Sequence, residues 1–122
     1  LDGIHGSPAE FKDITLSDYV GDRYTSLTDD PYQKGFVSNY ARSHYSEDVA
    51  ETGGRLISLT LEEREAMIAK AGPVGGPLMR KKFDMLQKWL KDSYGVDTER
   101  WCEIYHRRIA QLDNLDWESL DE

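Results

Sequence analysis

Hydrophobic side chains recur with helical periodicity over the second half of this chain. Between residues 78 and 94 they follow a three- and four-residue spacing, which predicts a helix with one buried face. That face carries Met79, Phe83, Leu86 and Leu90, and Met85 and Trp89 widen it. Gly95 is expected to end the helix, because glycine is favoured just after a helix C-terminus.

Capping signals predict two helices ahead of this one. Ser46 is the expected N-cap of the first, which Gly53-Gly54 should bend or weaken. Residues 60–63, Thr-Leu-Glu-Glu, form a capping box that opens the second helix, and this helix should end at Gly72-Pro73. The glycines and prolines of residues 73–77 then predict a loop.

A last helix is predicted after Asp97, whose side chain can cap it. One side of this helix is apolar enough to be expected to face the core. That side carries Trp101, Ile104, Tyr105, Arg108, Ile109 and Leu112. The acidic segment 113–122 follows and is expected to fray.

The first third of the chain has little periodicity. A short helix is predicted at Pro8–Ile14, with Ser7 as its cap and Glu10 completing a capping box. Residues 22–34 read as surface loop, since proline disfavours helix in the residue before it. The prediction is therefore a mainly α chain, residues 1–122 as a single unit: mostly loop over 1–45, helical over 46–112, and an acidic tail over 113–122.

Composition narrows the classes of partner. The 122 residues carry a formal net charge of -8, and the densest basic stretch, Arg80 to Lys82, is short, so nucleic acid is not an expected partner. A single cysteine, Cys102, excludes an internal disulfide and any site built from several cysteines. No apolar run reaches the length of a transmembrane segment.

Two acidic residues carry the candidate chemistry. On a helix, Glu47 and Glu51 lie one turn apart on the same face, where like charges repel unless a cation or a donor compensates. A zinc ion bound to one carboxylate, with the other accepting a hydrogen bond from a zinc-bound imidazole, would satisfy both. An exposed first turn rich in acids is the alternative, and spacing alone favours it.

The segments Tyr40-Ala41-Arg42-Ser43 and Ser46-Glu47-Asp48-Val49-Ala50-Glu51 resemble the third-ligand segment of gluzincin-type zinc metallopeptidases. In these enzymes an HExxH helix is followed by a tyrosine, a glutamate ligand and a further acid. The chain looks most like the zinc-binding metallopeptidases of bacterial surface lipoproteins associated with nutrient import. That resemblance extends from about Pro8 to the helix containing Phe83 and Trp89.

The resemblance implies a role for three residues. Glu47 would be the third protein ligand of zinc, and Glu51 would orient the first histidine of HExxH. Tyr40 would donate a hydrogen bond to the oxyanion formed when water attacks a peptide carbonyl. The implied reaction is hydrolysis of a peptide or protein substrate by metal-activated water. The resemblance also implies that the chain is the helical C-terminal subdomain of a zincin-like α+β metallopeptidase domain.

HExxH itself is not in the chain, and His5, His44 and His106 do not have its spacing. From the resemblance, we expect the motif just before Leu1, with residues 1–4 as the last turn of its helix. The N-terminal part of the same domain is then the expected partner of this chain. The chain alone is therefore expected to be inactive and to bind no stoichiometric zinc.

The resemblance also implies an exported protein, lipid-anchored at the cell surface or periplasmic. A non-catalytic helical interaction module of a surface lipoprotein complex, with Glu47 and Glu51 merely solvated, is the alternative function. The substrate and the oligomeric state are not determined by the sequence.

The remaining candidates are assigned ordinary roles. His44 is expected in a surface loop, His106 on a solvated helix face, and Cys102 as a small packing residue beside a core-facing Trp101. The aromatic residues are spaced as core residues rather than as a cofactor pocket. These are Phe83, Trp89, Tyr94, Trp101 and Tyr105.

Overall fold

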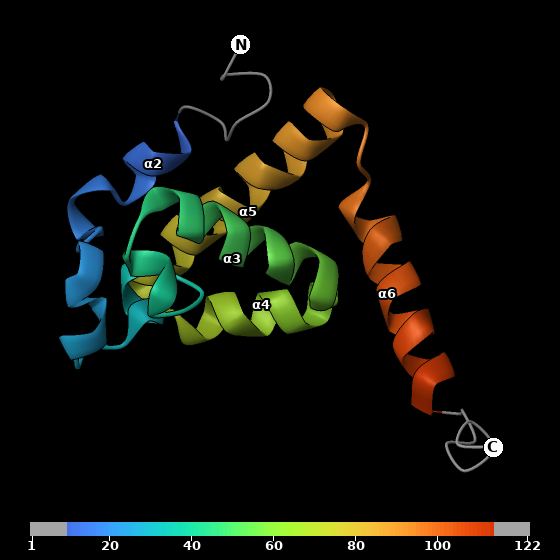
Figure 1. Ribbon diagram of the computed structural model, residues 1–122, viewed down its shortest axis with the longest axis horizontal. Coiled ribbons are helices and arrows are strands. Elements are labelled where there is room, and N and C mark those ends of the chain that lie inside the picture. The colour runs from blue at the N-terminus through green and yellow to red at the C-terminus, as the bar shows by residue number, and fades with distance from the viewer. Residues whose placement is uncertain (1–9, 114–122) are drawn as a thin grey trace.

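The computed structural model describes residues 10–113, and every regular element in that range is a helix. This confirms the predicted mainly α fold class. Four longer helices follow a series of short ones along the chain (Figure 1). The elements are α2 (Phe11–Ile14), η1 (Leu16–Asp18), η2 (Gly21–Ser26), η3 (Pro31–Lys34), η4 (Tyr40–Arg42), α3 (Tyr45–Ser58), α4 (Leu61–Lys70), α5 (Gly72–Tyr94) and α6 (Thr98–Asp113).

The first third is more regular than the sequence suggested, because residues 16–42 form four turns of 3-10 helix. The predicted loop 22–34 contains η2 and η3. Asp30 caps η3 by accepting a hydrogen bond from the Tyr32 N–H at 2.9 Å, and Gly35 ends it at a φ of 89°. The short helix is present as α2, but Glu10, expected inside it as part of a capping box, is instead the residue before its first turn and makes no capping hydrogen bond. The expected cap, Ser7, lies outside the described residues.

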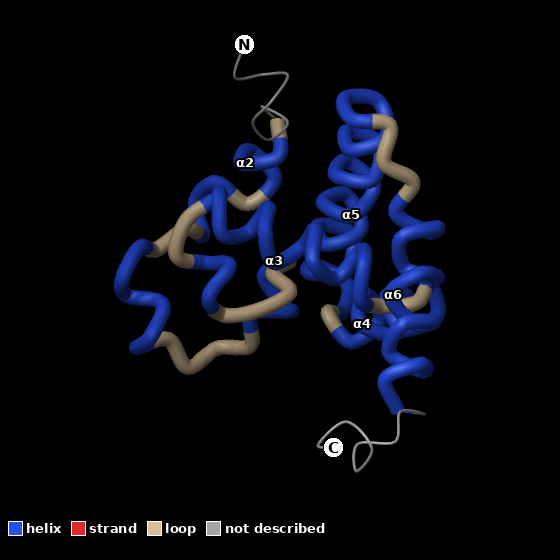
Figure 2. The backbone as a smooth tube through the Cα atoms, turned by 45° about the vertical axis from the view of Figure 1, so that its right-hand side comes forward, coloured by secondary structure: helices blue, strands red, loops and turns tan. Residues whose placement is uncertain are grey.

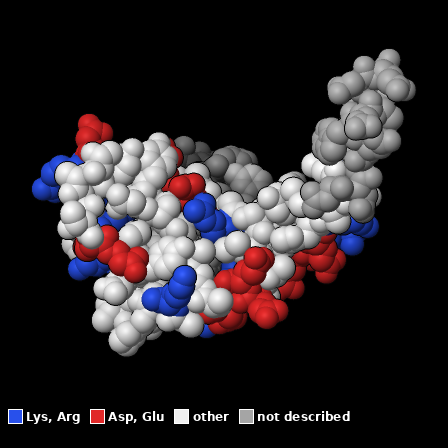
Figure 3. Space-filling model, turned by 90° about the horizontal axis from the view of Figure 1, so that it is seen from below, with Lys and Arg blue, Asp and Glu red and all other residues white. Residues whose placement is uncertain are grey.

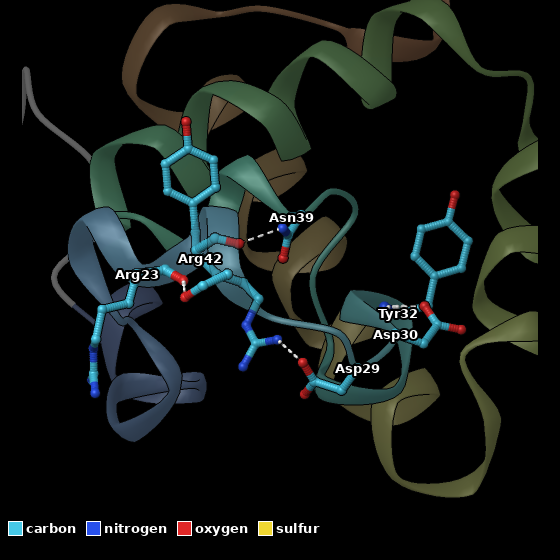
Figure 4. A network of polar contacts seen from close by, with 8 residues as sticks. Arg23, Asp29, Asp30, Tyr32, Asn39 and Arg42 are labelled. Carbon is cyan, nitrogen blue, oxygen red and sulfur yellow. Dashed lines mark hydrogen bonds and ion pairs between the residues drawn. The ribbon is translucent and has the colours of Figure 1, made fainter.

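Polar cross-links hold these short turns together (Figure 4). Arg42, which is almost fully buried, pairs with Asp29 at 2.8 Å between Nη1 and Oδ1. The Asn39 Nδ2 donates to the Tyr24 carbonyl at 2.6 Å. Side chains and caps thus replace the long-range backbone ladder that a sheet would provide, and they fix the segment that leads into α3.

Helix α3 passes through Gly53-Gly54 without interruption, so these glycines do not break it. The capping box that opens α4 is confirmed: Thr60 Oγ1 accepts from the Glu63 N–H at 3.1 Å, and Glu63 Oε1 accepts from the Thr60 N–H at 2.9 Å. The start of α4 is therefore set by local sequence.

The loop predicted at residues 73–77 is wrong, because these residues form the first turns of α5. Gly75 is needed there for close packing: a Cβ on it would lie 2.1 Å from the Tyr32 carbonyl oxygen of η3. Pro73 suits the start of a helix, and Pro77 is tolerated within it. The glycines and prolines that mark loops in isolation here allow a helix to approach a neighbouring backbone.

The predicted buried face of α5 is confirmed at Met79, Phe83 and Leu86. These side chains form the core with residues from α2, α3 and the segment before η4. The other buried members are Phe11, Val37, Leu56 and Ala71. Residues from both halves of the chain thus meet around α5, which runs behind α3 in Figure 1.

Helix α6 begins as predicted, with Asp97 Oδ1 accepting from the Glu99 and Arg100 N–H groups. Its predicted inward side is wrong, however. Cys102 is the residue that faces inward, and its thiol donates to the Leu59 carbonyl at 3.1 Å. Of the residues expected to face the core, only Ile104 is half-buried, and the others are exposed: Trp101, Tyr105, Arg108, Ile109 and Leu112. Helix α6 lies beside the other helices and extends past them at its C-terminal end (Figure 1).

Surface charge follows the acidic composition. On the face shown in Figure 3, acidic side chains gather in patches and the basic side chains lie apart from one another. Figure 2 shows α6 away from the short turns of the first third, and α6 packs mainly on α3. Among the helices of residues 10–113, none combines the length and the apolar character needed to cross a bilayer.

Candidate functional site

Helix α3 starts one residue before the predicted cap. His44 has extended backbone angles and is the N-cap, since its Nδ1 accepts from the Ser46 N–H at 3.1 Å. Ser46, predicted as the cap, is already inside the helix. An imidazole nitrogen thus does what a Ser, Thr, Asp or Asn side-chain oxygen does at other N-caps, and His44 is a capping residue rather than a residue of a surface loop.

Two neighbouring stripes of α3 have opposite environments. Asp48, Thr52 and Leu56 are fully buried. Glu47 and Glu51, one residue earlier on each turn, are half-buried. A helix advances by about 100° per residue, so the buried stripe fixes the direction in which the two glutamates point.

Tyr40 lies beside Glu47. The negative charge of Glu47 raises the pKa of the Tyr40 hydroxyl, with partial desolvation and a hydrogen bond to the same carboxylate contributing, and Glu51 adds a smaller effect of the same sign. The Tyr40 ring remains 44% exposed and packs edge-to-face on Tyr24. Tyr40, Glu47 and Glu51 therefore share one accessible surface.

Glu51 is held on both of its oxygens. The Ser38 hydroxyl donates to Oε1 at 2.9 Å, and Arg55 lies 3.5 Å from Oε2. Ser38 also accepts from the Ala41 N–H, so it links the η4 turn to α3. In contrast, no Lys or Arg within residues 10–113 forms an ion pair with Glu47.

A buried charge cluster lies directly behind this surface. Lys82 of α5 and Asp48 are both inaccessible to solvent, and their Nζ and Oδ2 atoms are 2.7 Å apart. Asp48 also accepts from the Tyr19 hydroxyl at 2.6 Å and from Thr52 Oγ1 at 3.1 Å. The Lys82 Nζ lies 3.7 Å from the centre of the Phe36 ring.

Burial has the largest effect on the ionisation of this cluster. It raises the pKa of Asp48 and lowers the pKa of Lys82, while the opposite charge of each partner acts in the reverse direction. Burial, with the nearby Asp48 carboxylate, also raises the pKa of Tyr19. Each of these groups is stabilised by contacts that only the folded chain provides.

Sequence reasoning missed most of these partners. Lys82 belongs to the short basic stretch Arg80 to Lys82, yet it is fully buried. Asp48 appeared in the sequence only as one acid of the segment from Ser46 to Glu51. Its spacing from Thr52 and Leu56 at four-residue intervals was the available signal. For Ser38, Arg55 and Tyr19 no signal in the sequence identified the contacts, because each depends on how distant segments pack.

The other candidates lie apart from this surface or have partners of their own. Burial raises the pKa of the Cys102 thiol, in agreement with the predicted packing role. His106 is half-buried on α6, contrary to the expected solvated position, and its Nε2 is enclosed without a hydrogen-bond partner in the described part of the chain. His5 lies outside the described residues.

The donor set fits zinc only in part. Within residues 10–113, no three His, Cys, Asp or Glu side chains are placed to hold one metal ion. A carboxylate oxygen such as that of Glu47 is an ordinary zinc ligand, but a protein zinc site usually has three or four protein ligands. The described residues can therefore supply one ligand of such a site and the groups around it.

Comparison with known proteins gives the family. None of the curated proteins matches the chain. A solved structure, titled as a putative zinc-binding metallo-peptidase from Bacteroides caccae ATCC 43185, superposes with a TM-score of 0.81 at 28% sequence identity. The match covers 91% of this chain and 43% of that one, so this chain spans less than half of its solved relative. A family described as "putative zinc-binding metallo-peptidase" matches residues 5–99, and the chain belongs to that family.

Proposed function

We propose that this chain is the part of a zinc metallopeptidase that supplies Glu47 as a metal ligand. The supporting observation is the environment of Glu47: the residue is half-buried, its carboxylate lies beside the Tyr40 hydroxyl, and no Lys or Arg in residues 10–113 forms an ion pair with it. Glu51 lies one turn away, and two carboxylates placed like this favour a nearby cation. The family gives zinc as the cation, and the imidazole ligands would come from HExxH in polypeptide outside the described residues.

Zinc, when bound in such sites, lowers the pKa of a coordinated water to about 7 and polarises a carbonyl. Tyr40 would act on the substrate side. A tyrosine hydroxyl, whose ordinary pKa is about 10, keeps its proton at neutral pH, and the neighbouring carboxylates raise this pKa further, so Tyr40 can donate to an oxygen that gains negative charge. The partial exposure of the Tyr40 ring leaves that hydroxyl accessible to a peptide.

Glu51 would orient a ligand rather than bind the metal. Ser38 and Arg55 hold its two oxygens, which fixes the carboxylate in one orientation. A fixed carboxylate can accept the second N–H of a metal-bound imidazole and so set the direction of the ring. The alternative interaction module requires merely solvated glutamates, and the specific contacts of Glu51 count against it.

Peptide hydrolysis by the intact protein, inactivity of this chain alone, and an exported, lipid-anchored location are parts of the same proposal. They follow from the resemblance to surface lipoprotein metallopeptidases. The substrate class is a peptide or protein.

The test compares the 122-residue chain with the same chain joined to the residues that adjoin it in its gene. In the longer protein, we expect Glu47→Ala to abolish tight zinc binding and Glu51→Ala to weaken it about 10–100-fold. Chelator competition measures both affinities. Glu62→Ala, an exposed acid in the first turn of α4, is the matched control. Unchanged zinc affinity in both α3 variants would overturn the assignment.

The chain alone should bind no stoichiometric zinc by calorimetry, since one carboxylate is too few ligands. Tight binding by the isolated chain would mean that other residues are the ligands.

A further inference from the structure

One buried ammonium group contacts both segments that carry the candidate site. Lys82 projects from α5 into a place with no solvent access. Its Nζ lies 2.7 Å from Asp48 of α3 and 3.7 Å from the Phe36 ring centre, in the segment before η4. A buried charge is tolerated only where such partners compensate the loss of water, so both contacts are required together.

The two contacted segments hold the candidate residues. Asp48 directly follows Glu47 and lies one turn before Thr52, which also bonds it. Phe36 precedes Ser38 by two residues and Tyr40 by four. Fixing Asp48 therefore fixes the rotation of α3, and fixing Phe36 fixes the start of the segment that carries Ser38 and Tyr40.

Tyr19 completes the arrangement. Its hydroxyl donates to Asp48 Oδ2 at 2.6 Å, and its ring packs edge-to-face on Phe36 with centroids 5.5 Å apart. Lys82, Asp48, Tyr19 and Phe36 thus form a closed set of contacts, which we call the Lys82 cluster. Rotating α3 by one residue, about 100°, would break the cluster and carry Glu47 away from Tyr40.

We propose that Lys82 is a positioning residue for the candidate zinc site, and that it holds the Glu47 and Glu51 carboxylates against Tyr40 and Ser38. The inference rests on the proposed function for the identity of the metal site. Stability alone does not require a charge here, because well-packed apolar side chains serve as well as a buried ion pair or better. An ammonium group in this position also constrains geometry, because it must contact the Asp48 carboxylate on one side and the Phe36 ring face on the other. This fixes how the two segments lie relative to each other.

The first measurement uses the 122-residue chain by NMR. Nuclear Overhauser effects between the Tyr40 ring protons and the Glu47 side chain report the contact directly. We expect Lys82→Met to weaken them strongly. Phe36→Leu leaves the Lys82–Asp48 pair intact but removes the ring face, and we expect it to weaken the same effects less. This second variant keeps the inference testable if Lys82→Met does not fold.

Two matched controls separate positioning from loss of stability. Leu86→Ala empties a core position one turn further along α5 and should destabilise the fold while leaving the Tyr40–Glu47 contact unchanged. Lys88→Met removes an exposed lysine of α5 that pairs with Asp92. In each variant, nuclear Overhauser effects between Cys102 and Leu59, which are in contact in the structure, show whether the rest of the fold is intact.

The second measurement is zinc affinity in the protein that includes the adjoining residues. Removing a group that contacts a metal ligand directly costs about 10–100-fold in metal affinity. Lys82 acts one contact further away, so we expect a loss at or below the lower end of that range for Lys82→Met and little change for the controls. Suppose that Lys82→Met and Phe36→Leu fold, keep the Tyr40–Glu47 nuclear Overhauser effects and bind zinc as tightly as the unmodified protein, while Glu47→Ala still abolishes zinc binding. That result would overturn the inference about Lys82 and leave the proposed function standing. If Glu47→Ala leaves zinc binding intact, the proposed function fails, and the NMR result still decides whether Lys82 positions Tyr40 and Glu47.

Discussion

The α3–α5 contact buries charged side chains, whereas the outer face of α6 exposes apolar ones. Between α3 and α5, an aspartate and a lysine are completely buried. On α6, a tryptophan and a leucine are about half exposed, at 54% for Trp101 and 47% for Leu112. The polar residues are thus inside at one place and the apolar residues outside at the other.

The difference shows what helical periodicity can and cannot give. Periodicity predicted a helix in the regions of α5 and α6, and it placed Trp101 and Leu112 on one side of α6. It did not determine which side meets the core: Thr98 and Cys102 of α6 pack inward instead. A buried charge with several partners indicates a contact that the fold needs in one geometry. An exposed apolar stripe indicates a surface that the described residues do not cover.

Removing the buried charge should have the largest effect on stability. Lys82→Met leaves Asp48 buried without its cation, and we expect the free energy of unfolding to fall by about 3–5 kcal/mol. Urea denaturation of the chain measures it. Lys88→Met, in an exposed pair on the same helix, should cost less than about 1 kcal/mol. Similar losses in both variants would mean that the Lys82 pair is no more important than a surface pair.

Apolar truncation should separate the two regions in the same way. Leu56→Ala removes a fully buried side chain of α3 and is expected to cost about 2–5 kcal/mol. Leu112→Ala on the exposed side of α6 should stay within about 0.5 kcal/mol. Thermal and chemical denaturation of both variants test this. A large cost for Leu112→Ala would show that another surface covers α6 in solution, and analytical ultracentrifugation would then identify a second copy.

The Arg42–Asp29 pair joins a buried cation to an exposed carboxylate, and its loss should have a smaller effect than the loss of Lys82 or Leu56. Arg42 lowers the pKa of Asp29, mainly through its hydrogen bond, below the value in the unfolded chain. The stabilisation from this pair should therefore be present above about pH 4, the ordinary aspartate range, and disappear as pH falls through the lowered value.

Asp29→Asn should consequently lower stability at pH 7 and have less effect at strongly acidic pH. Denaturation midpoints across this range measure the difference. Asp22→Asn, which replaces an exposed acid in the neighbouring η2 turn, is the control. A loss from Asp29→Asn that is constant with pH would contradict the assigned cause.

The candidate site was predictable where the signal was local. The sequence placed Glu47 and Glu51 on one helix, and the family resemblance added Tyr40. The partners of these residues were not predictable, because Ser38 meets Glu51 across thirteen residues and Lys82 meets Asp48 across thirty-four. The loop assigned to residues 73–77 failed for a related reason. Local rules treat glycine and proline as helix breakers, whereas Gly75 is packed directly against the backbone of η3.

Local sequence alone was enough for the helix over residues 78–94, the capping box at Thr60, the cap at Asp97 and the acidic pair on α3, because each depends on residues within one or two turns. The tertiary structure decided which faces are buried, that Asp48 and Lys82 meet inside, and that Trp101 lies outside. These outcomes depend on competition among distant segments for the same interior space. A buried ion pair is stable only when the whole surrounding fold supplies its partners.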